Sequence, residues 1–186
     1  MSDARQPRWP EPEPQSALVV LVPEVEDSVG AVRSAYDPGA AAGIPAHITI
    51  LYPFQSPDQL SAATIQQVRA CFRRTAPFDY TLVRVERFFS VLYLAPEPSV
   101  LFRALTLSVW KEFPAFPPYS GRYTDIVPHL TVASLADEEA LDQLSREFEI
   151  IARNFLPLPA RAKEVALLTN GTGPWQIEMT FSLGHA

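Results

Sequence analysis

The sequence has little cysteine, few charged residues and no long apolar run, and each scarcity excludes a class of protein. Cys71 is the only cysteine among 186 residues, so the chain can form neither an internal disulfide nor a cysteine-based metal site. No apolar stretch approaches the length that crosses a membrane, and the N-terminus lacks the apolar core of a secretion signal. We therefore expect a cytoplasmic protein with no membrane partner.

Basic residues are also scarce, which limits how the protein could bind nucleic acid. The chain has 15 Lys and Arg against 21 Asp and Glu, a net charge of −6. A protein that grips long duplex nucleic acid must neutralise many phosphates, so this balance argues against such a partner. It leaves room for a nucleotide or a short RNA. The length suits one domain, and we expect a monomer.

Two of the three histidines stand in the same four-residue frame. The frames are His47-Ile48-Thr49-Ile50 and His129-Leu130-Thr131-Val132. Side chains alternate along a strand, so each histidine and its threonine share one face, while the residue between them points to the core. Histidine gives and takes protons near neutral pH. The frames therefore suit acid–base attack on a phosphate diester, and they lack the further ligands of a zinc site. We expect no metal and no cofactor.

Apolar spacing and turn residues predict a chain of mixed helices and strands. The first fifteen or sixteen residues are rich in proline and charge and predict a disordered tail over 1–16, followed by a single domain over 17–186. The third histidine, His185, lies outside the frames and is expected to be a spectator. Strands are expected over 17–22, 79–89, 91–95, 162–168 and 175–183 and at the two His frames; helices are expected over 25–36, 57–74, 102–113 and 141–155.

The order of elements repeats, which indicates an internal duplication. His47 and His129 are 82 positions apart, and so are Pro77 and Pro159. The Pro-Glu pairs that begin at positions 23 and 96 are 73 apart, so the second half carries nine additional residues before its histidine, in the loop around 116–123. Two similar halves should place their His-Thr pairs face to face.

These paired frames resemble the 2H phosphoesterase superfamily, in particular its LigT-like branch of 2′-5′ RNA ligases and 2′,3′-cyclic phosphodiesterases. The context Leu51-Tyr52-Pro53-Phe54 after the first frame and Pro128 before the second adds to the resemblance. It implies an α+β, bilobal, duplicated fold with a curved antiparallel sheet and flanking helices in each lobe. It also implies an active-site cleft between the lobes.

Carried onto this chain, the resemblance implies that His47 and His129 are the catalytic pair and that Thr49 and Thr131 bind phosphate oxygens. It favours His129 as the base and His47 as the acid, although the near-symmetry of the frames leaves the two roles exchangeable. The implied reaction is metal-independent hydrolysis of 2′,3′-cyclic phosphates of nucleotides or RNA ends, with 2′-5′ ligation as the reverse of a related cleavage.

Aromatic and basic residues near the frames are candidate substrate contacts. Tyr52 and Phe54 follow the first frame, and Arg122 and Tyr123 lie in the longer loop before the second. Aromatics beside an arginine suit base stacking with a phosphate contact; Tyr52 and Phe54 could equally belong to the core. One alternative function remains open at this point, a module on the same fold that binds a nucleotide or RNA end without turnover.

Overall fold

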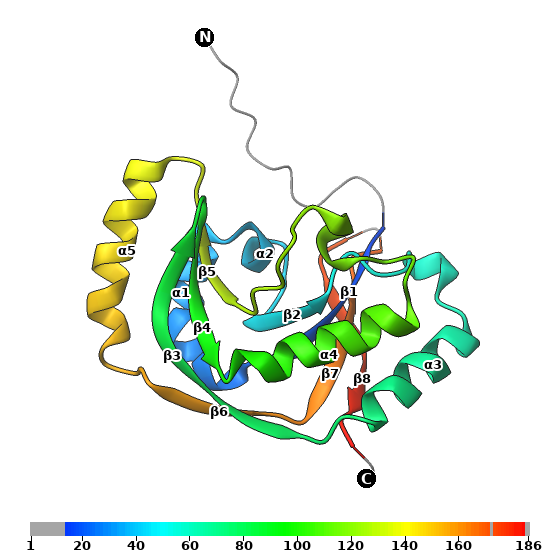
Figure 1. Ribbon diagram of the computed structural model, residues 1–186. Coiled ribbons are helices and arrows are strands. Elements are labelled where there is room, and N and C mark those ends of the chain that lie inside the picture. The colour runs from blue at the N-terminus through cyan, green and yellow to red at the C-terminus, as the bar shows by residue number, and fades with distance from the viewer. Residues whose placement is uncertain (1–13, 172, 185–186) are drawn as a thin grey trace.

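The fold consists of two four-stranded antiparallel sheets with helices around them (Figure 1). The computed structural model describes residues 14–171 and 173–184. One sheet has the order β2-β1-β7-β8 and the other has the order β5-β4-β3-β6. The expected α+β class with two antiparallel sheets is confirmed. The strands are β1 (Ser16–Leu21), β2 (His47–Leu51), β3 (Phe78–Phe88), β4 (Val91–Glu97), β5 (Leu130–Ser134), β6 (Leu158–Ala162), β7 (Glu164–Thr169) and β8 (Gln176–Ser182).

The two sheets are interleaved along the chain rather than built from consecutive halves. β3 lies in the first half of the sequence but pairs with β4, and β7 lies near the C-terminus but pairs with β1. A tight turn at Phe89 and Ser90 joins β3 directly to β4, which makes them hairpin neighbours. We call β2, which begins at His47, and β5, which directly follows His129, the His-bearing strands; each lies at the edge of its sheet next to an apolar strand.

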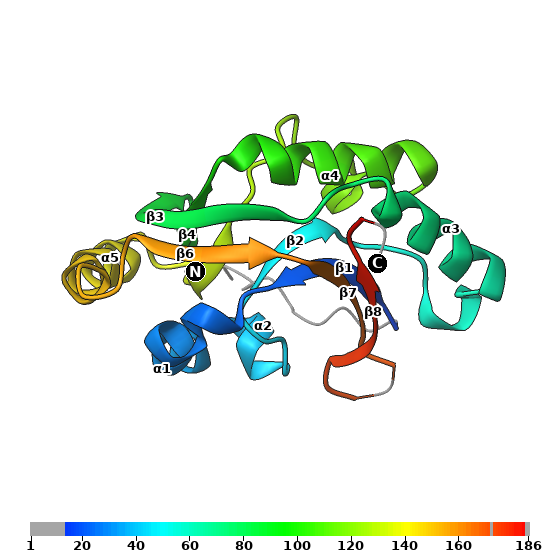
Figure 2. The ribbon, with the colours of Figure 1, turned by 90° about the horizontal axis from the view of Figure 1, so that it is seen from below.

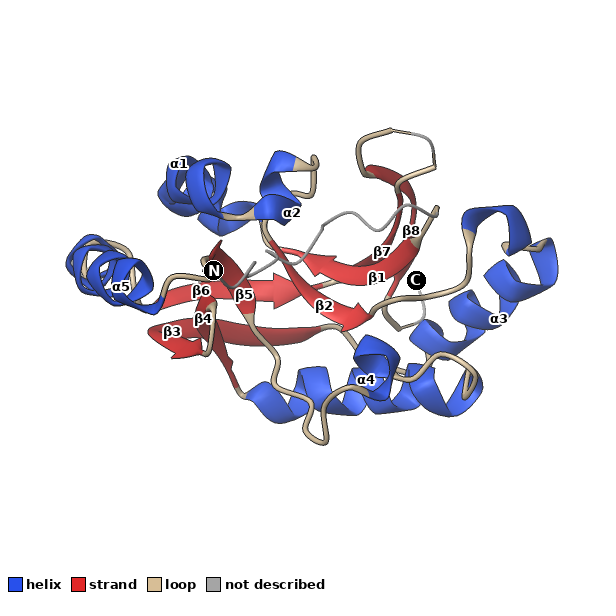
Figure 3. Ribbon diagram, turned by 90° about the horizontal axis from the view of Figure 1, so that it is seen from above, coloured by secondary structure: helices blue, strands red, loops and turns tan. Residues whose placement is uncertain are grey.

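Helices cover both sides of the sheets, with α1 and α2 on one side and α3 and α4 on the other (Figures 2 and 3). α1 contacts β5, and α4 contacts β2, so each of these helices packs against the His-bearing strand of the other sheet. α3 contacts α4 and β8, while α5 contacts β3 and β4. The helices are α1 (Glu26–Tyr36), α2 (Pro38–Ala41), α3 (Ala62–Arg73), α4 (Ser99–Glu112) and α5 (Glu138–Ala152), with 3-10 turns at Pro23–Val25, Pro57–Gln59 and Pro118–Gly121.

Helix α3 begins later than the expected start at Pro57. A 3-10 turn covers Pro57–Gln59, the backbone leaves helical geometry at Leu60, and Ser61 caps the helix by accepting a hydrogen bond from the backbone N–H of Thr64 at 3.1 Å. A serine hydroxyl at this position satisfies a backbone donor that has no partner within the helix. Proline at 57 therefore starts a turn and not the helix itself.

Two further expectations need correction. The strand expected over 162–168 is β7, and a further strand that was not expected, β6, precedes it, with Pro159 opposite Thr81. β6 is an edge strand, where a proline can leave its missing N–H facing away from the sheet. The domain also begins earlier than position 17, because Ser16 is buried in β1 and its hydroxyl donates to the Gln55 carbonyl at 2.6 Å. Residues 1–13 of the expected tail, and His185, lie outside the described residues.

A single main core joins the two sheets and the helices into one unit. Its residues come from all eight strands and from the inner faces of α1, α3, α4 and α5. A smaller cluster on the other face of the first sheet includes Val19, Leu168 and Trp175. Because the main core spans both sheets, the lobes share their apolar packing and fix the two His-bearing strands relative to one another.

Replacing Phe102 by alanine should destabilise the whole protein. Phe102 is fully buried on α4, and its ring makes edge contacts with Phe78 and Tyr80 at centroid distances of 5.1 and 4.9 Å. Loss of such a side chain costs about 3–5 kcal/mol through lost burial and a residual cavity. Urea unfolding should show one transition at a clearly lower midpoint, whereas Leu107→Ala on the exposed side of α4 should change stability by under about 0.5 kcal/mol.

Candidate active site

The two His frames adopt the same local structure. In each, the histidine and threonine are half-buried, while the residue between them, Ile48 or Leu130, has 0% exposure. The alternation expected from the sequence is therefore confirmed. His47 opens β2, and His129 directly precedes β5.

A β-bulge follows each His-x-Thr frame at the equivalent position. In the first sheet Thr49 pairs with Val19 and Leu51 with Leu18, which leaves Ile50 as the additional residue. In the second sheet Thr131 pairs with Tyr93 and Ala133 with Leu92, which leaves Val132. A bulge bends its strand and increases the twist, and bulges often re-aim side chains beside functional sites. Its recurrence 82 positions later agrees with the duplication inferred from the sequence.

Each histidine is oriented by a hydrogen bond to a backbone carbonyl two residues earlier. His47 Nδ1 lies 2.8 Å from the Pro45 carbonyl oxygen, and His129 Nδ1 lies 2.7 Å from the Val127 carbonyl oxygen. A carbonyl can only accept, so both Nδ1 atoms carry the proton. In the neutral ring the lone pair is then on Nε2. Both side chains thus have Nε2 available for proton transfer.

β2 contacts β5, and the charge of His129 is among those that act on His47. Burial lowers the pKa of His47 from 6.5 to about 4; the hydrogen bond to Pro45 opposes this, and the positive charges of Arg33 and His129 add to it. Burial also lowers the pKa of His129, against its hydrogen bond to Val127. Without a bound ligand, the neutral form of both imidazoles is therefore favoured, and this preference is stronger for His47.

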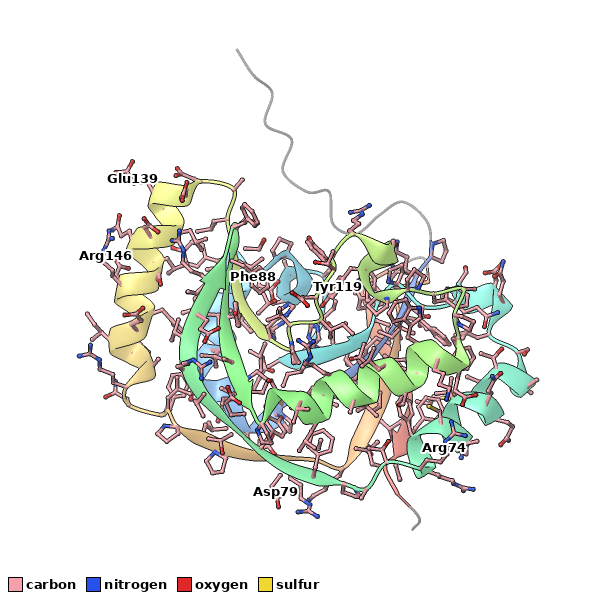
Figure 4. All side chains as sticks on the ribbon, in the orientation of Figure 1. Arg74, Asp79, Phe88, Tyr119, Glu139 and Arg146 are labelled. Carbon is pink, nitrogen blue, oxygen red and sulfur yellow. The ribbon has the colours of Figure 1, made fainter. Side chains whose placement is uncertain are left out.

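Three aromatic rings enclose the imidazole of His129. Phe88 and Tyr93 present their rings edge-on at centroid distances of 5.1 and 5.6 Å, and Tyr119 lies nearly parallel to the imidazole at 6.4 Å. Phe88 ends β3, while Tyr119 comes from the 3-10 turn at Pro118–Gly121; both are labelled in Figure 4. These apolar neighbours account for the burial that disfavours the charged form of His129.

Tyr119 links the two frames, although the sequence favoured Arg122 and Tyr123 of the same loop as site residues. Its side chain hydrogen-bonds with Thr49 of the first frame while its ring stacks on His129 of the second. Burial raises the pKa of Tyr119 to about 12, so its hydroxyl keeps its proton. Its backbone N–H donates to the Tyr52 carbonyl at 2.6 Å, and φ is positive at Tyr119 and at the two residues after it. The loop is thereby folded back over the frames.

The four predicted substrate contacts have different positions. Arg122 and Tyr123 are exposed on the loop that carries Tyr119, and the Tyr123 ring contacts the Tyr119 ring edge-on at 5.7 Å. Tyr52 is half-buried; its hydroxyl donates a hydrogen bond to the Gln15 side chain, and its ring contacts the Trp175 ring edge-on. Phe54 is only 4% exposed and packs between Phe113 and Phe116. Phe54 is therefore a core residue, and its assignment as a substrate contact is wrong.

Arg33 is a buried cation beside the first frame that the sequence analysis also missed. Its side chain is 1% exposed and donates to the Asp37 carboxylate at 2.9 Å and to the Ile44 carbonyl at 3.0 Å. A buried charge is tolerated only when it is paired and hydrogen-bonded. The i,i+4 spacing of Arg33 and Asp37 is visible in the sequence, but their burial depends on the packing of α1 against β5.

Outside the two His frames, the described residues provide weaker candidates for a functional site. An open pocket of about 430 Å³, lined by residues that include Glu24, Asp79 and Glu97, contains neither His frame; Figure 4 places Asp79 far from Tyr119. Within residues 14–171 and 173–184, no three His, Cys, Asp or Glu side chains are grouped to hold a metal ion. No helix in the same ranges is long and apolar enough to cross a membrane.

A family model described as the 2′-5′ RNA ligase superfamily matches residues 21–174. The chain belongs to this superfamily. A "putative phosphoesterase" of Bacillus cytotoxicus is 27% identical over 172 residues, which cover 89% of this chain and 95% of that protein. A Bacillus cereus protein of the same description is 29% identical over 177 residues, with the same coverage.

Solved structures share the fold. Escherichia coli LigT, complexed with 3′-AMP, matches with a TM-score of 0.56 and 16% identity, covering 93% of this chain and 100% of that chain. A Thermus thermophilus protein matches with a TM-score of 0.52 and 18% identity, covering 92% and 100%. The similarity covers nearly the whole chain and confirms the bilobal fold that the family resemblance implied.

Replacing His47 by glutamine should make the free energy of unfolding less dependent on pH below pH 6.5. The lowered pKa means that unfolded chains bind a proton between pH 6.5 and 4 that folded chains do not, so the free energy of unfolding falls as pH decreases through this window. His47→Gln removes that contribution. Between pH 6.5 and pH 4.5, urea unfolding should show a smaller loss of unfolding free energy for the variant than for wild type. Equal losses would contradict a lowered pKa of His47 in the folded protein.

Proposed function

We propose that the protein hydrolyses 2′,3′-cyclic phosphates of nucleotides or short RNA ends by general acid–base catalysis with two histidines. The observation that carries the proposal is the matched pair of imidazoles, each with Nδ1 tied to a carbonyl and Nε2 available, on contacting strands. Membership of the 2′-5′ RNA ligase superfamily supports phosphoesterase or ligase chemistry in general.

The reaction needs two proton transfers on opposite sides of the phosphorus. Water attacks phosphorus while one neutral Nε2 takes its proton; the bond from phosphorus to one ribose oxygen breaks, and the other imidazolium gives that oxygen a proton. The product is a phosphate monoester beside a free hydroxyl. Each proton transfer of this kind contributes about 10²–10⁴-fold to the rate.

The surroundings of the two histidines favour distinct roles. Burial, Arg33 and His129 together hold the pKa of His47 at about 4, whereas His129 has no buried arginine acting on it. His47 is thus the better candidate for the neutral base in hydrolysis, and His129 for the acid once the bound cyclic phosphate monoanion favours its charged form. This reverses the roles that the family resemblance favours.

Hydroxyl groups beside the histidines can stabilise the charge that builds on the phosphate. Thr49 and Thr131 share the face of their histidines, and Tyr119 adds a third protonated hydroxyl next to Thr49. Donors placed where charge develops are worth more than donors in water because they need no reorganisation. LigT structures in complex with 3′-AMP and ATP support a nucleotide-sized substrate, as does the net charge of −6.

Substitution of either histidine should abolish hydrolysis of the four nucleoside 2′,3′-cyclic phosphates. We expect kcat/KM to fall by at least about 10²-fold in His47→Ala and in His129→Ala. It should be unaffected by EDTA and bell-shaped in pH for wild type. Reversed-phase separation of the 2′- and 3′-monophosphates measures the rate and shows which ribose oxygen leaves. His47→Ala with unchanged turnover would contradict the mechanism.

The same variants separate catalysis from simple binding. The double variant His47→Ala with His129→Ala should keep its affinity for a nucleoside monophosphate within severalfold while losing turnover. Wild-type protein that binds nucleotides but turns over none of the four substrates would favour the binding module instead. Retention of the fold is checked by the urea midpoint of each variant.

Arg122 should contribute to substrate affinity, and Tyr119 to catalysis. Arg122 is exposed on the loop that covers the frames, where its guanidinium can reach a phosphate or base. Arg122→Ala should raise KM several-fold at unchanged kcat. Tyr119→Phe keeps the ring over His129 and removes only the hydroxyl, so this variant should lower kcat. An unchanged KM in Arg122→Ala would remove this residue from the site.

A further inference from the structure

The carbonyl that holds each histidine belongs to a peptide group, and the two peptide groups differ in chemistry. In the first frame the Pro45 carbonyl accepts from His47, and the N–H of the same peptide group belongs to Ala46. In the second frame the Val127 carbonyl accepts from His129, but the following residue is Pro128, which has no N–H. Only the first peptide group can transmit a second hydrogen bond.

Glu26 provides that second hydrogen bond. Its Oε2 atom accepts from the Ala46 N–H at 2.7 Å, so a carboxylate, a peptide group and the His47 imidazole form a continuous chain. Glu26 opens α1, and its other oxygen faces Arg33 at 3.7 Å. Hydrogen bonds in a chain strengthen one another, and a charged acceptor gives the strongest links.

In both frames, an arginine side chain donates a hydrogen bond to the backbone carbonyl three residues before the histidine. Arg33 on α1 donates to the Ile44 carbonyl at 3.0 Å, and Arg103 on α4 donates to the Ile126 carbonyl at 2.8 Å. Ile44 and Ile126 are 82 positions apart, each three residues before its histidine. Both segments are therefore held in place by an arginine of an earlier helix. The chain of hydrogen bonds from Glu26 through the Pro45–Ala46 peptide group, here called the carboxylate relay, is found only at His47.

We propose that Glu26 is a positioning residue for His47, acting through the Pro45–Ala46 peptide group in the way that a triad carboxylate acts directly on its histidine. The relay keeps the proton on Nδ1 and stabilises the imidazolium that forms when His47 Nε2 takes a proton from water. It opposes the burial and the Arg33 charge that act against that cation. The role in catalysis rests on the proposed function, whereas the hydrogen-bond relay itself does not.

The test is an NMR titration of the His47 and His129 imidazoles in wild type and in Glu26→Gln, in the full-length protein. Glutamine keeps an acceptor for the Ala46 N–H but removes the charge. We expect the pKa of His47 to fall by about half a unit or more, with His129 unchanged. Asp37, Arg33 and His129, the other charged or titratable groups that act on His47, remain in place. An unmoved or raised His47 pKa would overturn the proposal.

Kinetics supply the second readout. For a cyclic nucleotide, Glu26→Gln should lower kcat by about three- to tenfold at unchanged KM, a small part of what a positioned base contributes. It should also shift the limb of the pH profile that belongs to His47. Glu24→Gln is the matched control, because Glu24 is an exposed acid two residues earlier and has no contact with the Pro45–Ala46 peptide; it should leave both titrations and kcat unchanged.

A third variant separates charge from packing. Glu26→Asp keeps the negative charge and should give a His47 pKa between those of wild type and Glu26→Gln, whether or not the urea midpoint changes. A purely structural Glu26 would lower the midpoint in both variants and leave the titration of His47 in place, which would overturn the relay. Absence of turnover in wild type would count against the proposed function, and the NMR titration would still decide on Glu26.

Discussion

The hydrogen bond from each histidine Nδ1 to a carbonyl two residues earlier is the interaction on which the candidate site depends. It is local in sequence, yet it is useful only because the preceding segment is rigid. An arginine from a helix holds that segment in both sheets, and a bulge just after each threonine bends the strand in the same place. The orientation of each imidazole is therefore set by a backbone carbonyl and not by direct contact with a carboxylate side chain.

Within this near-symmetric frame the electrostatic surroundings are unequal. His47 has a buried arginine, an aspartate and, through a peptide group, a glutamate around it, whereas His129 is enclosed by three aromatic rings. The two frames thus present equivalent side chains in different electrostatic surroundings.

The sequence predicted the parts of the site that depend on short-range pattern. Alternation along the frames placed Ile48 and Leu130 in the core. The bulges and the arginine hydrogen bonds recur 82 positions apart, in agreement with the inferred duplication, but they were not predicted. The sequence pattern failed where tertiary packing decides. Phe54 follows the first frame but turns into the core against Phe113, while Tyr119 reaches the site through three consecutive residues with positive φ that no periodicity reveals.

The interleaving of the two sheets bears on how the chain acquires its shape during synthesis. β1 and β2 are made early, but the strand that flanks β1 on its other side, β7, is made more than a hundred residues later. The first sheet therefore leaves the ribosome half-formed, with one edge of the apolar strand β1 unpaired, while β3, β4 and β5 of the second sheet can already pair. Such an intermediate exposes an unpaired strand edge. A nascent chain of this topology would depend on rapid completion, or on a chaperone, to avoid association with other chains.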